Sequence, residues 1–248
     1  MRFLLYNIRY GTGAEARFHR PFPGMGYLRR TEVRLDQLID WFREQDPDII
    51  GLVEVDMGSY RTRGGRNQAE IIAESLGCDH IHECKYHGAS VHRRIPLFRN
   101  QGNAIITRHN IEGGHFHFFA HGVKRLIIEL QLEHLRLFLV HLSLGYKTRK
   151  QQLEFLAYLV GESDRPVVVA GDFNTFFGPR EYHDFLAKTG LVSANLDNLP
   201  THPSLRPRRQ LDFIFHDHRI IPQRLEIPAM PYSDHLPLIF DFELAPQP

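Results

Sequence analysis

The sequence predicts an α/β protein with mixed sheets, and three observations lead to this fold class. Short apolar segments, rich in β-branched and aromatic residues, recur along the chain at strand length. Amphipathic segments of helical periodicity separate several of them. Two further segments are joined only by Glu133 and His134, a connection that suits an antiparallel hairpin. A hairpin together with helical connections favours a mixed sheet over a purely parallel one.

Eight segments have the length and composition of β-strands. Each is short and dominated by β-branched or aromatic residues. The predicted strands are residues 3–8, 49–55, 103–107, 126–132, 135–142, 166–170, 211–215 and 238–244.

Four amphipathic helices are expected between these strands. The clearest follows Thr31, a candidate N-cap, and aligns Leu35, Leu38, Ile39 and Phe42 on one face. The second aligns Ala69, Ile72, Ala73 and Leu76 and stops at Gly77. The third begins at Thr148, with a capping box to Gln151, and runs through Leu153, Leu156 and Val160 to Gly161. The fourth begins at Pro179 and stops before Gly190.

Three stretches are too irregular for helices or strands: residues 12–30, 83–101 and 195–210. They are rich in Arg, Pro and aromatic residues, and loops this long in a compact domain are usually functional or disordered. We therefore expect them to form the rim of a site. No repeat, low-complexity tract or change in composition marks a linker, so residues 1–248 are expected to form a single domain.

The charge balance excludes a protein that coats nucleic acid through general basicity. The 248 residues include 30 Lys and Arg against 29 Asp and Glu, a formal net charge of +1. Any binding of anions must therefore come from local clusters of charge.

Signals for membrane insertion and secretion are not found in the sequence. No run of about 18 apolar residues occurs, which excludes a transmembrane helix, and the apolar part of residues 1–6 is too short for a secretory signal. Cys78 and Cys84 cannot make a disulfide framework. The simplest expectation is a protein of the reducing cytoplasm.

Polar side chains interrupt or end the predicted strands six times, and this pattern is the main functional signal. Burial of an unpartnered carboxylate or amide costs several kcal/mol, so each position needs an explanation. Taken alone, Asn7 or His141 could equally be an ordinary strand-end residue with satisfied hydrogen bonds. Recurrence at six strands favours a shared site. The residues are Asn7, Glu54, His141, Asp172 with Asn174, Asp212, and Asp234 with His235.

This set of side chains suits the hydrolysis of a phosphate ester. Carboxylate and amide oxygens bind a hard cation such as Mg²⁺ or Mn²⁺, which would hold phosphate oxygens and neutralise developing charge. An aspartate can orient or deprotonate the attacking water, and a neighbouring amide can help to fix that geometry. A histidine held by a second carboxylate can stay protonated and stabilise the charged transition state.

Seven short motifs occur in order along the chain. GDFN at 171–174 and SDHLP at 233–237 are specific as a pair, and LDFIF at 211–215 strengthens them by order and spacing. The motifs around Asn7 and His141, YNIRYG and VHLSLG, would be weak alone. The other two are GLVEVD around Glu54 and GNAIITR at 102–108. From about residue 3 to residue 244, the chain resembles the endonuclease/exonuclease/phosphatase superfamily.

The resemblance implies a four-layer α/β/β/α sandwich of two packed mixed sheets, with the site at one end of the sheets. It also implies roles for the residues of the motifs. These are Asn7 and Glu54 at the metal and Asp234 near it; Asp172 aligning or activating the water; Asn174 supporting phosphate and water; His235, paired with Asp212, as the transition-state histidine; His141 as a second phosphate contact; and Asn103 of GNAIITR among the substrate-binding residues.

One position departs from the pattern of this superfamily. DNA-repair members commonly have an acidic residue two positions after the first Asn, where this chain has Arg9. The difference weakens an interpretation as an abasic-site nuclease and leaves the shared hydrolytic residues unaffected.

Two groups of histidines and cysteines invite a metal-site interpretation. Cys78, His80, His82 and Cys84 alternate along a candidate strand. At a rise of about 3.3 Å per residue the two cysteines would lie about 20 Å apart, too far for one tetrahedral ion. Unless the segment folds back on itself, it is not a zinc site. The histidines of GGHFHFFAH, at 113–121, are more simply explained by packing on a strand face.

Arginines cluster in the loops between the strands that carry the motifs. Residues 85–99 and 202–210 contain no Asp or Glu, so an electropositive rim around a phosphate site is at least as good an interpretation as solvated surface. The clusters are Arg61, Arg63 and Arg66; Arg93, Arg94 and Arg99; and Arg206, Arg208 and Arg209, the last of which are expected to bind substrate. Asp56, which follows Glu54 by two positions, is interpreted as a turn residue rather than a ligand.

The sequence therefore favours a metal-dependent phosphoesterase, most of all a phosphodiesterase acting on a lipid-linked, small-molecule or nucleic-acid phosphate ester. A nuclease acting on DNA or RNA is the nearest alternative. Aromatic residues beside arginines at 17–30 suit nucleic-acid bases or the phosphorylated headgroups of a membrane surface equally well. Arg9 and the small net charge count against duplex DNA. An inactive member that only binds a phosphorylated ligand is disfavoured, because no core residue is lost.

Overall fold

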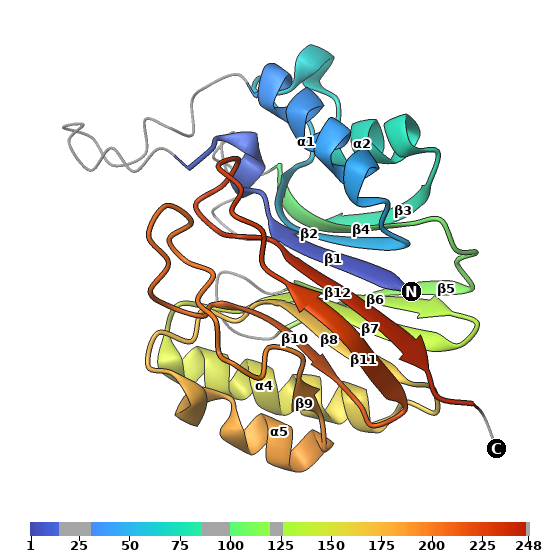
Figure 1. The fold of residues 1–248 in the computed structure, drawn as a ribbon, viewed down its shortest axis with the longest axis vertical. Helices are drawn as coiled ribbons and strands as arrows, with labels where there is room; N and C mark the ends of the chain where they lie inside the picture. The colour runs from blue at the N-terminus through green and yellow to red at the C-terminus, as the bar shows by residue number, and fades with distance from the viewer. Residues whose placement is uncertain (15–30, 86–99, 120–125, 247–248) are drawn as a thin grey trace.

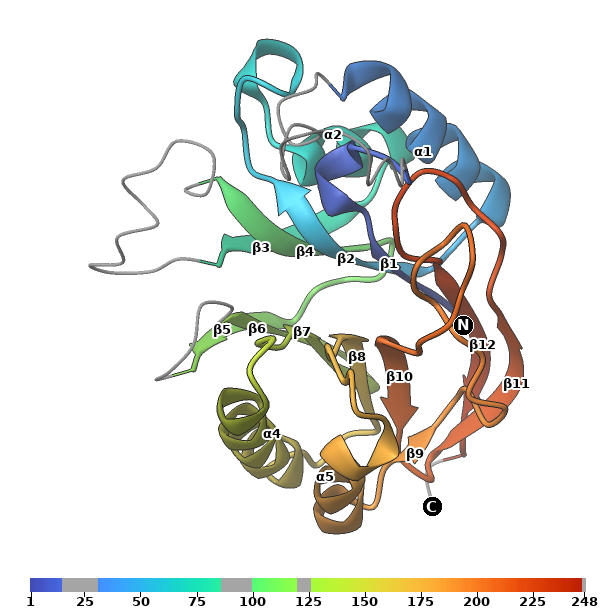
Figure 2. The ribbon, with the colours of Figure 1, turned by 90° about the vertical axis from the view of Figure 1, so that its left-hand side faces the viewer.

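Two six-stranded sheets pack face to face, and helices cover the outer face of each (Figures 1 and 2). The structure is a computed structural model that describes residues 1–14, 31–85, 100–119 and 126–246. From top to bottom in Figure 1 the layers are α1 with α2, the first sheet, the second sheet, and α4 with α5. The predicted four-layer α/β/β/α sandwich of two mixed sheets is confirmed.

The first sheet has the strand order β11-β12-β1-β2-β4-β3. Its central strands β1 and β2 are parallel, with Asn7 opposite Val53 at their carboxyl ends, and the other pairs are antiparallel. The strands span Arg2–Asn7 (β1), Ile49–Asp56 (β2), Asp79–Cys84 (β3), Gln101–Thr107 (β4), Ile220–Glu226 (β11) and Leu238–Leu244 (β12).

The second sheet repeats this plan with the order β5-β6-β7-β8-β10-β9. Its central strands β7 and β8 are parallel, and His141 lies opposite Asp172 at their carboxyl ends. The predicted hairpin is confirmed, since Leu132 of β6 pairs with Leu135 of β7. The strands span Gly113–Phe118 (β5), Leu126–Leu132 (β6), Leu135–His141 (β7), Val167–Asp172 (β8), Val192–Ser193 (β9) and Asp212–His216 (β10).

The helices lie where the sequence predicts them, with two corrections at their starts. They span Glu32–Gln45 (α1), Gln68–Leu76 (α2), Tyr146–Gly161 (α4) and His183–Thr189 (α5). The capping box from Thr148 is wrong, because α4 begins two residues earlier after Gly145. Pro179 begins a 3-10 turn, Pro179–Glu181, that precedes α5. Gly77 ends α2 in the left-handed conformation, as expected.

Four strands of the structure are not among the eight predicted ones: β3, β5, β9 and β11. Of these, β3 and β5 fall in the segments 78–84 and 113–121, which the sequence offers only as a candidate strand and a strand face. Strands β3, β5, β9 and β11 occupy the edges of the two sheets. An edge strand covers little of the core, so it needs few apolar residues and leaves a weak pattern in the sequence. Histidines and glycines in β3 and β5, and exposed residues in β11, show this directly.

The largest core cluster lies between the sheets. Side chains of Phe3 and Leu139, one from each sheet, meet over Gly51, where an added Cβ would lie 3.1 Å from both. The central strands are buried on both faces, because helices cover their outer sides. Burial on both faces explains why these strands appear in the sequence as continuous apolar runs.

Gly171, the first residue of GDFN, fits where no other residue would. It lies opposite Val140 in the parallel pair β7–β8, and its φ of 147° is a value that L side chains rarely adopt. An added Cβ would overlap the carbonyl oxygen of Val140. The close approach of the two backbones places Asp172 at its position beside His141.

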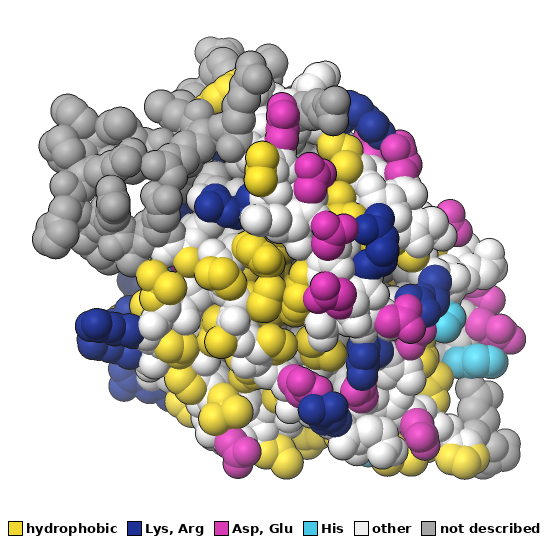
Figure 3. Space-filling view, turned by 45° about the horizontal axis from the view of Figure 1, so that its top comes forward, with side chains coloured by type: hydrophobic (Ala, Val, Ile, Leu, Met, Phe, Trp, Pro, Cys, Tyr) yellow, Lys and Arg dark blue, Asp and Glu magenta, His cyan; other side chains and the backbone are white. Residues whose placement is uncertain are grey.

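Charged side chains of both signs are interspersed on the face drawn in Figure 3, around a central group of hydrophobic side chains. This mixture agrees with the formal net charge of +1. None of the helices in the described ranges is long and apolar enough to cross a membrane. Cys78 and Cys84 are not joined in a disulfide.

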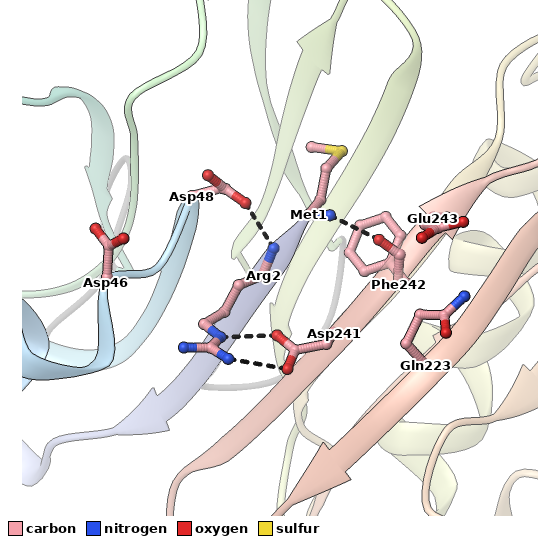
Figure 4. A pocket seen from close by; sticks show the side chains of 8 residues that line it. All are labelled: Met1, Arg2, Asp46, Asp48, Gln223, Asp241, Phe242 and Glu243. Carbon is pink, nitrogen blue, oxygen red and sulfur yellow. Dashed lines mark hydrogen bonds and ion pairs between the residues drawn. The ribbon is translucent and has the colours of Figure 1, made fainter.

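A hollow lies at the start of β1, and several of the residues that line it bind one another (Figure 4). Arg2 donates through Nε to Asp241 and through its backbone N–H to Asp48, both at 2.7 Å. The amino group of Met1 donates to the carbonyl of Phe242 at 2.7 Å. These contacts attach the beginning of the chain to the first sheet, at the end opposite to Asn7.

Candidate active site

The candidate site lies at the carboxyl ends of the two central parallel pairs, at the left of Figure 1. Strands β1 and β2 bring Asn7 and Glu54, and strands β7 and β8 bring His141 and Asp172. Because the sheets pack face to face, the two pairs end beside each other. The site is therefore shared between both sheets, which is where parallel strands commonly present functional side chains.

Glu54 lies in a β-bulge of β2. The register with β4 shifts between Val53 and Val55, and Glu54 has a φ of 59°, which is unusual for a residue other than glycine. The amide oxygen of Asn103 on β4 accepts from the backbone N–H of Glu54 at 3.3 Å. This contact supports the bulge, which turns Glu54 away from the alternation of the strand.

The carboxylate of Asp172 is the centre of the site. Its Oδ2 accepts from Nδ2 of Asn7 at 3.1 Å and lies 3.3 Å from Nε2 of His141. Nε2 of His235 is 4.0 Å from the same oxygen. Residues from β1, β7 and the loop before β12 therefore converge on one buried oxygen atom.

Asp212 and His235 form a buried pair. Nδ1 of His235 lies 2.7 Å from Oδ2 of Asp212, and the hydroxyl of Thr201 donates to the same oxygen at 2.6 Å. These contacts direct Nε2 of His235 towards Asp172. The second oxygen of Asp212 is buried and has no hydrogen-bond partner among the described residues.

The pair also changes the protonation of His235. Burial lowers the pKa of this imidazole, but the carboxylates of Asp212, Asp172 and Asp234 outweigh burial and raise it to about 10. Burial has the opposite effect on the carboxyl group of Asp212: it raises the pKa, although the hydrogen bonds from His235 and Thr201 lower it in part. We take the pair as a protonated imidazole bonded to a carboxylate near neutral pH.

Asn174 holds the turn that follows β8. Its φ is 52°, its backbone N–H donates to Oδ1 of Asp172 at 3.0 Å, and its side chain donates to the carbonyl of Leu142 at 2.9 Å. The amide thus links the turns after β7 and β8. Both oxygens of Asp172 are now accounted for, one by Asn174 and the other by the groups that converge on it.

Asp234 lies at the mouth of the site beside Arg9. Nε of Arg9 is 3.4 Å from Oδ2 of Asp234, and Arg9 begins the 3-10 turn Arg9–Gly11, two residues after Asn7. The hydroxyl of Ser233 donates to the carbonyl of Asn7 at 2.6 Å, so the two segments are also joined through the backbone. Arg9, which departs from the pattern of DNA-repair members, here faces an acidic residue of the site.

Lys85 is a residue of the site that the sequence does not indicate. It is 2% exposed, and its Nζ lies 3.0 Å from Nδ1 of His141 and 3.9 Å from Oε1 of Glu54. An ammonium group can only donate, so Nδ1 of His141 is the acceptor in this contact. The ring proton of a neutral His141 is then on Nε2, which faces Asp172.

His202 and Thr201 are further residues that sequence reasoning missed. The ring of His202 lies 4.8 Å from that of His235, and burial together with His235 lowers its pKa. Both residues lie in the loop 195–210, whose length and lack of pattern were the only signals of function. The loop is irregular, as predicted, apart from a bridge between His202 and Arg209.

The arginines of this loop are exposed to solvent. Arg206, Arg208 and Arg209 all lie on the surface, and the guanidinium of Arg209 stacks over Phe176 at 5.6 Å. Phe176 follows Asn174 by two residues, so this loop borders the GDFN turn. The aromatic and basic residues predicted at 17–30 and the cluster Arg93, Arg94 and Arg99 lie outside the described residues.

Arg61 does not belong to an electropositive rim. It is fully buried, and its Nε lies 2.6 Å from Oδ2 of Asp56. Asp56 also accepts from the backbone of Gly58 and from the hydroxyl of Ser59, which confirms its interpretation as a turn residue. Arg66 is on the surface and pairs with Glu74.

The donor atoms of the site fit a hard divalent cation. Asn7, Glu54 and Asp172 offer amide and carboxylate oxygens and no thiolate. Ligand atoms of Asp172, Asp212 and His235 also lie within 4.8 Å of one another, but a protonated His235 bonded to Asp212 has no free ring nitrogen to offer a cation. Nδ2 of Asn103 is buried beside Glu54 without a hydrogen-bond partner among the described residues; as a donor it would bind a water or a phosphate oxygen rather than the cation itself.

Solved structures of similar fold include both characterised and uncharacterised proteins. An endonuclease/exonuclease/phosphatase family protein from Leptotrichia buccalis is 18% identical, with 98% of this chain and 100% of that chain covered and a TM-score of 0.73. A mannosyl-6-phosphatase from Bacteroides thetaiotaomicron is 16% identical over 98% and 100% of the chains, with a TM-score of 0.69. An AP endonuclease from Archaeoglobus fulgidus is 17% identical over 98% and 100%, with a TM-score of 0.66. At such identities these structures establish the fold.

Sequence comparison gives the relationship itself. No curated protein sequence matches the chain. Residues 4–235 match the model of the Endonuclease/Exonuclease/phosphatase family, a stretch that runs from β1 to His235 and contains the residues that meet at the carboxyl ends of both sheets. With this match and the two-sheet sandwich in agreement, the chain belongs to the endonuclease/exonuclease/phosphatase family.

Proposed function

We propose that the protein is a metal-dependent phosphoesterase, and more specifically a phosphodiesterase, that hydrolyses its substrate by attack of a water molecule. The observation that carries the proposal is the convergence of Asn7, His141 and His235 on one oxygen of Asp172. Membership of a family named for nucleases and phosphatases supports the reaction class.

In this proposal Asp172 orients the water and accepts its proton, because a buried carboxylate with fixed neighbours is a well-positioned base. His235, protonated and held by Asp212, donates a hydrogen bond to a phosphate oxygen and stabilises its growing charge. His141, on the other side of Asp172, donates a hydrogen bond from Nε2 to the phosphate as its second contact. Asn174 keeps the carboxylate of Asp172 in its orientation.

We assign the cation to Asn7 and Glu54, with Asp234 beside them. Mg²⁺ or Mn²⁺ held there would bind phosphate oxygens and neutralise the charge that develops on them. We also propose four residues that contact the substrate. Asn103 would do so inside the site, and Arg206, Arg208 and Arg209 at its rim.

A panel of substrates tests the proposal. Nucleic acids, nucleotides, inositol phosphates, sugar phosphates and phospholipids would be incubated with Mg²⁺ or Mn²⁺, with Asp172→Asn as the matched blank. We expect hydrolysis of at least one class, abolished in Asp172→Asn and in excess chelator. Full activity in excess EDTA would overturn the metal assignment, and activity in Asp172→Asn equal to that of the unchanged protein would overturn the role of the carboxylate.

A nuclease is the second candidate. The exposed arginines of loop 195–210, one of which, Arg209, lies over Phe176, resemble a surface for a phosphate backbone with a stacked base. A preference for single-stranded or duplex nucleic acid in the panel would identify this function. Binding without turnover of any substrate would instead indicate a module that only recognises phosphorylated ligands.

A further inference from the structure

A second cluster of ligand-type residues lies on the outer side of the first sheet, apart from the candidate active site. Glu70 of α2 and His80 and His82 of β3 bring ligand atoms within 4.8 Å of one another. All three side chains are half-buried rather than fully exposed. The sequence shows the two histidines, but the carboxylate comes from another element and becomes visible only in the fold.

The local structure explains why these residues meet. Residues two apart in a strand point to the same face, so His80 and His82 lie side by side, with ring centroids 5.2 Å apart and planes within 6°. Ile81 points the other way and packs against the core between the sheets. The histidines therefore face α2, where Glu70 lies in the first turn.

The three side chains make no hydrogen bond or ion pair with one another or with other residues in the described ranges. Carboxylates and imidazoles that converge without satisfying one another are a common form of metal site.

We propose that Glu70, His80 and His82 bind a borderline transition-metal ion, with Zn²⁺ as the representative ion. Two imidazoles and one carboxylate suit Zn²⁺, Co²⁺ or Ni²⁺ rather than Mg²⁺, and three protein ligands leave a coordination position for water or another ligand. Two donors of one tetrahedral Zn²⁺ lie roughly 3.4 Å apart, given bonds of about 2.0–2.1 Å. The ligand atoms of the three residues lie within 4.8 Å of one another, and rotation of these half-buried side chains would bring them to this shorter distance.

The ion would link α2 to an edge strand of the first sheet. Among the described strands, β3 pairs with β4 alone, and it leads into Lys85, the residue beside His141. His82 precedes Lys85 by three residues, roughly 10 Å along the strand, so the two sites share no ligand. This separation makes the proposal independent of the proposed function.

Calorimetric titration with Zn²⁺ tests the site, with excess Mg²⁺ present to occupy the candidate active site. The variants are His82→Gln and Glu70→Gln, and the matched controls are His134→Gln in the exposed β6–β7 turn and Glu44→Gln on the surface of α1. We expect one equivalent of Zn²⁺ to bind the unchanged protein and both controls in the presence of Mg²⁺. Loss of a residue that hydrogen-bonds to a metal ligand weakens metal binding about 10- to 100-fold, so loss of a ligand itself should weaken Zn²⁺ binding at least as much.

Two outcomes would overturn the proposal. One is Zn²⁺ binding in His82→Gln and Glu70→Gln that equals binding in the controls. The other is a loss of binding in Cys78→Ser or Cys84→Ser alone, which would place the ion at a thiol. Titration with Co²⁺ adds a spectroscopic measurement, since visible absorption of a four-coordinate ion should weaken in both ligand variants. Circular dichroism of each variant shows that it is folded.

Discussion

At the residue scale, the state of His141 depends on Lys85. The ammonium donates to Nδ1 of His141 at 3.0 Å, and this contact places the ring proton on Nε2, towards Asp172. Lys85→Met keeps the length of the side chain and removes the donor. We expect kcat/KM to fall about 10- to 100-fold, the usual effect of losing a residue that orients a functional histidine. Kinetics on the best panel substrate would measure it, together with the nitrogen NMR shifts of His141.

The control for this variant is Lys188→Met, because Lys188 is exposed on α5. Replacement of a buried charge by an apolar residue need not destabilise a protein, so unfolding should be measured alongside activity. Unchanged kcat/KM with an unchanged His141 tautomer in Lys85→Met would show that Lys85 is a packing residue only.

Asp212 and His235 should behave as one unit at the same scale. Their 2.7 Å contact and the position of Nε2 near Asp172 make each residue dependent on the other. Asp212→Asn and His235→Gln should each reduce kcat by about 10²- to 10⁴-fold, and the double variant should be little worse than the more damaged single one. Rate losses that multiply in the double variant would show that the two side chains act separately.

At the scale of elements, Glu129 joins three strands of the second sheet. The carboxylate lies on β6, 1% exposed, and is bonded to His117 of β5, Gln131 of β6 and Arg136 of β7 at 2.6–2.7 Å. Burial raises the pKa of Glu129, but these bonds outweigh it and hold the pKa below its ordinary value of 4.5. The charged form is therefore more favourable in the folded protein than in the unfolded chain.

The sign of the pH dependence follows from this lowered pKa. Stability from Glu129 is fully present above pH 4.5, the ordinary value, and is lost as the pH falls through the lower pKa of the folded state. Glu129→Gln should lower the free energy of unfolding by about 2 kcal/mol at pH 7, with a smaller difference at pH 3. Urea unfolding at both values would test this, with exposed Glu133→Gln as the control. An equal difference at both pH values would contradict the charged role of Glu129.

The same scale shows which parts of the fold and the site the sequence predicts. Strands β1, β2, β7 and β8 are apolar on both faces, so polar residues at their ends stand out, and Asn7, Glu54, His141 and Asp172 can be found by pattern alone. Lys85 cannot, because an ordinary-looking lysine enters the site only when β3 takes its place at the sheet edge. Thr201 and Glu70 could not be predicted for the same reason. Each lies beside partners distant in sequence, Asp212 for Thr201 and the two histidines of β3 for Glu70.

At the scale of the whole molecule, the small net charge makes local clusters decisive for substrate binding. Arg206, Arg208 and Arg209 are exposed, and Arg209 lies over Phe176, next to the GDFN turn. We expect the three arginines to contact substrate away from the reacting phosphorus. The triple alanine variant should raise KM with little change in kcat. For a polynucleotide the effect should shrink as salt rises, because several phosphates release counterions together, whereas a small ester should show a weak dependence.

Kinetics at two ionic strengths would measure both effects, with Arg43→Ala on α1 as the control for a change of surface charge. A KM equal to that of the unchanged protein at both salt concentrations would make these arginines ordinary solvated surface. A higher KM that does not respond to salt would favour a small phosphate ester as substrate.

The division of the site between two sheets links activity to their alignment. Asn7 and Glu54 move with the first sheet, and His141 and Asp172 move with the second, so a small sliding of one sheet over the other would separate the groups while both sheets stayed intact. Hydrolysis should then report on sheet alignment before spectroscopy detects any loss of structure. As urea is raised, activity would decline ahead of circular dichroism, and trimming Leu139, which packs over Gly51 from the opposite sheet, would widen the interval between the two.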